Sequence, residues 1–153
     1  HGKDYCEFLD KFAQTKWQQT LSIDAFNQIL SCTERHPYYF NVLLRILFSQ
    51  GSVPTVKIVQ QLWDDLAGKK RNDLLSETKA LTVIQKKLLI SIAGGKKRGL
   101  TGKDFLSESK LASASVVRAL DELLDEDFIE KIEGNYELVD PLLKTAIKQL
   151  NVS

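Results

Sequence analysis

The sequence has no methionine and is poor in cysteine, histidine and proline, with two cysteines, two histidines and three prolines in 153 residues. Cys6, Cys32, His1 and His36 match no zinc-binding spacing, so we expect no metal site. Two cysteines without a preceding signal-peptide pattern predict reduced thiols in a cytoplasmic protein, not a disulfide framework. The chain opens on histidine and glycine instead of methionine, and we expect it to be part of a longer protein.

The sequence also lacks an excess of charge of either sign and any long apolar run. Lysine and arginine number 21 against 20 acidic residues; dividing the chain after residue 80 leaves 10 against 9 before and 11 against 11 after. Nucleic-acid binding usually draws on a positive excess, which is missing here. The most apolar run, residues 38–48, is interrupted by Asn41 and Arg45 and is too short to cross a bilayer, so we expect no membrane partner.

Motifs for nucleotide chemistry and for catalysis are missing as well. Nothing resembles GxxxxGK[ST], and no apolar strand ends in paired acids, so this chain supplies neither a phosphate cradle nor magnesium ligands. Cys32 and His36 are four residues apart, a spacing at which a thiol and an imidazole can pair. No orienting third residue and no glycine-rich turn accompanies them, so we expect no catalytic residue and no cofactor bound by this chain alone.

What is present is a strong pattern over residues 81–139. Thr82 and Gln85 form a capping box ahead of a first helix that stops at Gly94. A short second helix is expected to end near Ser109, and a third to begin near Ser113. Two β-type runs then flank residues 133–135, a turn in which glycine and asparagine tolerate positive φ. This order predicts a winged helix-turn-helix with a two-stranded β wing.

The third helix of that module has an apolar and a polar face. At 100° per residue the expected core positions are Val116, Val117, Leu120, Leu123 and Leu124. The opposite arc consists of Ala114, Ser115, Arg118, Asp121, Glu122 and Asp125. This arc is the one that would enter a DNA major groove, and it holds one cation and three acids.

Residues 1–80 read as four amphipathic helices followed by a linker. The helices are expected over 4–17, from Ser22 to about residue 34, over 37–50 with Pro37 in the first turn, and from about Thr55 to Gly68. A mixed segment over 67–80 is the expected linker, and a last helix is expected to begin at Asp140 and Pro141. The fold class is therefore mainly α, with a helical bundle and linker over 1–79 and a winged helix domain with a C-terminal helix over 80–153.

Four stretches together resemble the carboxy-terminal region of the archaeal-type ATPases, which belong to the STAND branch of the AAA+ P-loop ATPases. They are RHPYYF at 35–40, LTVIQKKLLISIA at 81–93, ASASVVRALDELLDEDFIEK at 112–131 and YELVDPLLK at 136–144. In that family a P-loop domain comes first, a helical lid follows, and a winged helix whose wing runs into an aspartate-proline pair comes last. The resemblance covers nearly the whole chain and implies a four-helix AAA+-type lid bundle over its first half.

The resemblance also implies a nucleotide-contacting turn. The family's lid motif, glycine, any residue, proline, brings the proline turn against nucleotide held by the P-loop domain. His36 and Pro37 occupy that place, while Arg35 stands where the family usually has glycine. ATP and magnesium would then be cofactors of the parent protein only, and the upstream P-loop domain would be the chain's first partner.

Two functions of different class follow from these patterns. The first is a non-catalytic regulatory region, a lid plus a winged helix that contacts its own chain or a partner protein. The alternative is the winged-helix DNA-binding module of a transcription regulator. In that case DNA bases would face Ser113, Ser115 and Arg118. The DNA phosphates would lie near Lys96, Lys97, Arg98, Lys110 and Lys131.

Overall fold

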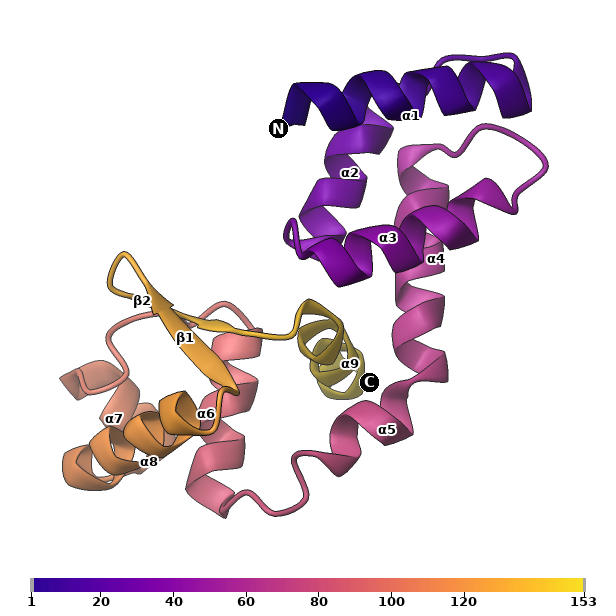
Figure 1. Cartoon of the computed structure of the whole chain (residues 1–153). Helices are drawn as coiled ribbons and strands as arrows, with labels where there is room; N and C mark the ends of the chain where they lie inside the picture. The colour runs from indigo at the N-terminus through magenta and orange to yellow at the C-terminus, as the bar shows by residue number, and fades with distance from the viewer. Residues whose placement is uncertain (1, 153) are drawn as a thin grey trace. The chain divides into compact units, whose positions relative to one another are not determined.

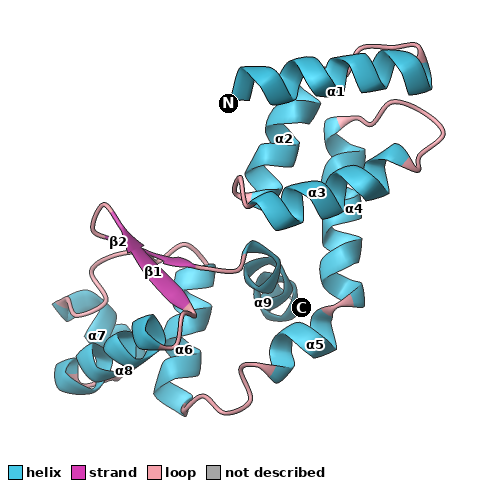
Figure 2. Ribbon diagram, in the orientation of Figure 1, coloured by secondary structure: helices cyan, strands magenta, loops and turns pink. Residues whose placement is uncertain are grey.

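The computed structural model describes the backbone of residues 2–152 and the side chains of residues 6–151. Over this range the chain is mainly helical, with one β hairpin (Figures 1 and 2). It divides into two compact units, His1–Lys69 and Lys70–Ser153. Among the helices described, none combines the length and apolar character needed to cross a membrane.

Unit 1 consists of four helices, α1 (Gly2–Trp17), α2 (Ile23–Thr33), α3 (Pro37–Phe48) and α4 (Val56–Lys69). The Ser22 hydroxyl caps α2 by accepting a hydrogen bond from the Ala25 amide, and Pro37 opens α3 because its fixed φ suits the first helical turn. α2 packs on both α3 and α4. The largest fully buried side chains of unit 1 are Leu9, Ile29, Leu43, Leu47 and Trp63.

Unit 2 contains the three helices and the hairpin that the sequence pattern predicts. They are α6 (Val83–Ala93), α7 (Lys103–Ser109), α8 (Ser113–Asp125), β1 (Ile129–Ile132) and β2 (Asn135–Leu138), with α5 (Arg71–Ser76) before them and α9 (Pro141–Val152) after them. α6 is the central element, because it packs on α8, on α9 and on β2 (Figure 1). The largest fully buried side chains of unit 2 are Leu88, Leu89, Ile92, Leu123, Ile129, Leu142 and Leu143.

Two caps fix the ends of this unit's helices. The expected capping box forms: the Thr82 hydroxyl accepts from the Gln85 amide, and the Gln85 side chain accepts from the Thr82 amide. Before α9, one carboxylate oxygen of Asp140 accepts from the amides of Leu142 and Leu143, at 2.9 and 3.1 Å. Each cap satisfies amides that would otherwise lack a partner at a helix start.

The hairpin is antiparallel, with Ile132 opposite Asn135, so a two-residue turn joins the strands. The sequence placed positive φ at Gly134 and Asn135; the structure has it at Glu133 (φ 51°) and Gly134 (φ 83°). The reason is register: two positive-φ residues form the tight turn whose twist matches the strands, which leaves Asn135 in β2. The Tyr136 amide also donates to the Lys97 carbonyl at 2.8 Å, so the segment after α6 borders β2.

The division between the units lies at Lys69 and Lys70, ten residues before the expected boundary at 79 and 80. The expected linker includes α5, which packs on α9 and buries Leu74. The Arg71 guanidinium donates to the Gln149 side-chain oxygen at 2.9 Å. These contacts make the segment part of unit 2.

The core face of α8 differs from the expected one at two positions. Val117 is 46% exposed and Leu124 is half-buried, whereas Ala119 is buried with Val116, Leu120 and Leu123. The buried arc is therefore centred between Val116 and Leu123, and Val117 lies to one side of it.

Candidate functional site

The exposed face of α8 is the surface that a winged helix-turn-helix would present to a DNA groove. It begins just after Lys110, which takes a left-handed conformation (φ 59°) at the end of α7. Along it Ser113, Ala114, Val117, Arg118, Asp121 and Asp125 are exposed. Ser115 is only half-buried instead of fully exposed, and Glu122 accepts a hydrogen bond from the Gln85 side chain. The first two turns of this face are small, apolar or weakly basic, and the later turns are acidic.

The charge of α8 and the hairpin together is strongly negative. Residues 113–140 contain two cations, Arg118 and Lys131. The same segment contains nine acids: Asp121, Glu122, Asp125, Glu126, Asp127, Glu130, Glu133, Glu137 and Asp140. The acids of α8's last turn and of the loop after it, residues 125–127, are all exposed. A surface of this kind repels a phosphate backbone and attracts basic groups.

Two of the lysines proposed for phosphate contact have partners within the hairpin region. The Lys97 ammonium forms an ion pair with the Glu137 carboxylate at 2.6 Å. The Lys131 ammonium lies 5.2 Å from the centre of the Tyr136 ring, within reach of a cation–π contact. Lys96, Arg98 and Lys110 are exposed. Lys131 is exposed as well, so the structure leaves four of the five proposed phosphate contacts on the surface, and Lys97 is the half-buried one.

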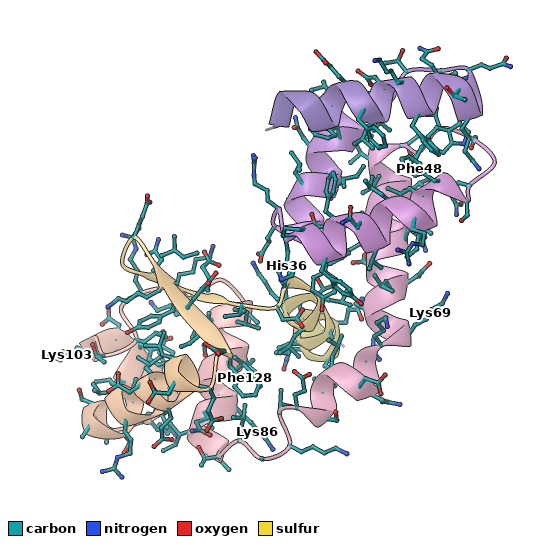
Figure 3. The ribbon with its side chains drawn as sticks, in the orientation of Figure 1. His36, Phe48, Lys69, Lys86, Lys103 and Phe128 are labelled. Carbon is teal, nitrogen blue, oxygen red and sulfur yellow. The ribbon has the colours of Figure 1, made fainter. Side chains whose placement is uncertain are left out.

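The proposed nucleotide-contacting turn lies in unit 1, at the start of α3 (Figure 3). His36 is the N-cap residue of α3 but makes no side-chain cap, and its ring lies 5.1 Å from the Tyr39 ring. Its Nδ1 atom is buried and has no hydrogen-bond partner among the residues described. Arg35 has φ 60°, a left-handed conformation that glycine adopts most readily.

Cys32 and His36 do not form a nucleophilic pair. The Cys32 thiol lies between α2 and α4, where it accepts from Gln28 at 3.5 Å and lies 3.6 Å from the Gln60 side-chain oxygen. Burial raises the pKa of Cys32 from 9.0 to about 11; the Gln28 hydrogen bond partly opposes this, and the Asp64 charge adds to it. A thiol with this pKa is protonated at neutral pH and is a poor nucleophile. Within residues 6–151, no three histidine, cysteine or acidic side chains converge as a metal site.

One surface feature was not expected from the sequence: an apolar groove of about 120 Å³ in unit 2. α5, α6, α9 and the turn after α5 supply its lining, which consists of Leu75, Thr78, Lys86, Leu89, Ile90, Ile147, Leu150 and Asn151. A sequence signal for it exists, because Val83, Lys86, Lys87 and Ile90 recur on one exposed face of α6. That signal was masked by the stronger apolar pattern on the buried face of the same helix.

Comparison with known proteins gives one family and no individual relative. Residues 74–149 match a family described as a probable winged helix domain. No curated protein and no solved structure matches the chain. The matched range runs from α5 to α9 and includes α6, α7, α8 and the hairpin in the order that the fold requires. The segment from residue 74 to residue 149 is therefore a winged helix domain.

Proposed function

We propose that this chain is the non-catalytic, regulatory carboxy-terminal region of a STAND-type P-loop ATPase, and that its winged helix domain binds protein and not DNA. One observation carries the second part: residues 113–140, which comprise α8, the hairpin and the loops beside them, hold nine acids against two cations. The first part is supported by the resemblance of four sequence stretches to that family and by the conformation of one turn.

The charge of α8 decides between protein and DNA as partner. Double-stranded DNA carries one negative charge per ~1.7 Å of its axis, and binding proteins neutralise it with lysine and arginine. In α8 Arg118 is followed one turn later by Asp121 and two turns later by Asp125, both exposed. Phosphates near the later turns of α8 would meet carboxylates, whereas a basic protein surface would find complementary charge there.

The turn at Arg35 supports the ATPase part. In the family a glycine precedes the residue before the lid proline, and glycine is favoured where φ is positive. Arg35 holds φ 60° at that position although it is not glycine. The backbone thus keeps a glycine-type conformation ahead of His36 and Pro37, as a family-like turn requires.

The proposed mechanism is a change of orientation driven by nucleotide. The His36 ring and the turn at Pro37 would contact nucleotide held by the upstream P-loop domain, and this contact would favour one orientation of unit 1. α4 and the following segment would then transmit the change to the winged helix domain. ATP and magnesium would supply phosphoryl transfer in the parent protein, and the residues of this chain would only bind and orient.

Hydrogen exchange on the full gene product tests the ATPase part. We expect a non-hydrolysable ATP analogue to slow amide exchange over residues 33–40, and His36→Ala to weaken that protection. Arg45→Ala, an exposed substitution further along α3, is the matched control and should leave the protection intact. A gene product without a phosphate-binding loop, or equal amide exchange with and without nucleotide, would contradict the proposal that the chain belongs to a P-loop ATPase.

DNA binding is the second candidate, favoured by one specific observation. Lys110, Ser113 and Arg118 are all exposed where α8 begins, and Lys96 and Arg98 are exposed after α6. These groups could reach phosphates if the acids of the later turns stayed outside the groove.

Neutralising the acids separates the two candidates. We expect the triple variant Asp121→Asn, Asp125→Asn, Glu126→Gln to gain salt-sensitive DNA binding that the unaltered chain lacks, because the cations at the start of α8 would no longer be opposed. A control with Asp73→Asn, Glu77→Gln and Asp104→Asn changes the net charge equally but leaves α8 unaltered. Equal DNA binding by the unaltered chain and the α8 variant would show that the acids do not exclude DNA.

A further inference from the structure

The apolar groove of unit 2 is a second surface, formed by elements other than α8 and the hairpin. Its floor is apolar: Leu89 and Ile147 are buried there. Its rim holds two large apolar side chains that remain accessible, Ile90 at 42% and Leu150 at 44% exposed. A groove of about 120 Å³ accommodates one branched or aromatic side chain, and its rim would lose further apolar surface to water on binding.

The polar surroundings of this groove are basic. Lys86, labelled in Figure 3, lines it, and Lys87 is exposed beside it on α6. α6 and α9 contain no acidic residue; their charged residues are Lys86, Lys87, Lys144 and Lys148. α5 and the turn after it supply two acids, Asp73 and Glu77, together with two cations, Arg71 and Lys79.

The sign of this charge is opposite to that of α8 and the hairpin. One surface of the winged helix domain is thus apolar and basic, and another is acidic, although residues 74–149 carry 12 cations and 12 acids and so have no net charge. Lysine ammonium groups beside accessible Ile90 and Leu150 favour an occupant that combines an apolar side chain with carboxylates.

We propose that the groove between α5, α6 and α9 binds an acidic amphipathic segment of a partner protein. One large apolar side chain of that segment fills the groove against Leu89, Ile90 and Ile147. Carboxylates next to it in the partner pair with Lys86 and Lys87. The proposal rests on the proposed function only in taking the partner to be a protein.

A protein segment suits this groove better than nucleic acid does. Phosphates would satisfy the lysines but leave Ile90 and Leu150 in water, whereas an amphipathic segment covers both kinds of group. A second copy of the chain could also contact the groove through its acidic α8, and such a contact between two different surfaces builds rings or open chains of copies. Self-association is therefore measured as a separate outcome.

The test is a fluorescence anisotropy titration of the whole chain against a labelled peptide. The peptide is a 14-residue helix former with leucines at positions four apart on one face and glutamates on the other. A matched peptide replaces every glutamate by lysine. We expect saturable binding of the acidic peptide with a Kd of roughly 100 µM or tighter, and none of the basic one.

Paired variants locate the binding. Ile90→Ser and Lys86→Glu should each weaken binding about tenfold, through lost apolar contact and reversed charge respectively. Val117→Ser, at a residue of similar exposure on α8, and Lys103→Glu, on α7, should leave the Kd unchanged. Circular dichroism confirms that each variant is folded.

Three results would overturn the proposal. They are no saturable binding, equal binding of the acidic and basic peptides, and a loss of peptide affinity in Val117→Ser as large as that in Ile90→Ser. Concentration-dependent self-association that Ile90→Ser abolishes would show that the occupant is a second copy, which also overturns it. None of these results concerns DNA, so the proposed function fails or holds on the separate DNA titrations.

Discussion

Cys32 shows how the surroundings of one side chain override its intrinsic chemistry. The sequence offers a thiol four residues from an imidazole, yet in the structure the thiol meets the side chains of Gln28 and Gln60 from α2 and α4. Gln60 is 28 residues away in sequence, so no local pattern could predict this contact. Burial between these helices removes water from the thiol, and this desolvation is the main cause of the raised pKa of Cys32.

The pKa of Cys32 predicts a pH dependence. Because it is raised from 9.0 to about 11, the folded state favours the neutral thiol. The stabilisation is complete below about pH 9 and is lost as the pH rises toward about 11. In a Cys6→Ser background, alkylation of Cys32 at pH 8 should be about 100-fold slower than that of an ordinary thiol, in proportion to its thiolate fraction.

The measurement is the rate of iodoacetamide labelling against pH, followed by mass spectrometry. The free energy of unfolding of the Cys6→Ser protein should decline above about pH 9. Cys32→Ala in the same background is the control, and this decline should be absent from it. Labelling with an inflection near pH 9 would contradict the account of Cys32.

Gln85 shows both the reach and the limit of sequence reasoning at this scale. Its part in the capping box with Thr82 follows from a spacing of three residues and is confirmed. Its side chain also donates to the Glu122 carboxylate on α8, 37 residues away. That contact depends on how α6 packs on α8, which periodicity does not specify. Local hydrogen bonds were predictable here, and contacts between elements were not.

At the scale of elements, the hairpin turn shows where a residue is at odds with its conformation. Glu133 holds φ 51° in a two-residue turn, a conformation that asparagine tolerates better than glutamate. Residues 133–135 were identified as the turn from sequence, but register, which strand pairing sets, decided which of them has positive φ. The same holds for α8, whose helical range was predictable while the exposure of Val117 was not.

We expect Glu133→Asn to raise the free energy of unfolding by about 0.5 kcal/mol, because it relieves left-handed strain at the first turn position. Urea denaturation followed by circular dichroism measures the change. Gly134→Ala, at φ 83°, should lower stability by about 1 kcal/mol or more and serves as the matched control. A loss of stability in Glu133→Asn would show that the turn does not have this geometry in solution.

At the scale of the whole molecule, the division between the units was the least predictable feature of the fold. The segment over 67–80 reads as a linker because it mixes glycine with charge, but α5 belongs to the winged helix domain through Leu74 and through the bond from Arg71 to Gln149. A weak apolar pair becomes a packed helix only once α9 is beside it. The position of α9 is set by the fold and not by the local sequence.

Two fragments test this division. We expect residues 70–153 to unfold cooperatively, and residues 80–153 to be less stable by about 2 kcal/mol, because the shorter fragment loses the burial of Leu74 and its neighbours. Leu74→Ala in the longer fragment should reproduce part of the loss. Thermal and urea denaturation give the comparison. Equal stability of the two fragments would place α5 outside the domain.

Because α8 and the hairpin are acidic, we propose that the winged helix domain binds protein and not DNA. The most direct test of this proposal is an anisotropy titration of a labelled 25-base-pair duplex with the unaltered chain at 50 and 200 mM salt. We predict no saturation up to about 50 µM protein at either salt concentration, well within the range in which DNA-binding proteins bind nonspecifically. The contrary result would be saturable binding that Arg118→Ala abolishes. In that result the logarithm of the association constant would fall linearly with the logarithm of the salt concentration, with a slope of about −0.9 per phosphate contact.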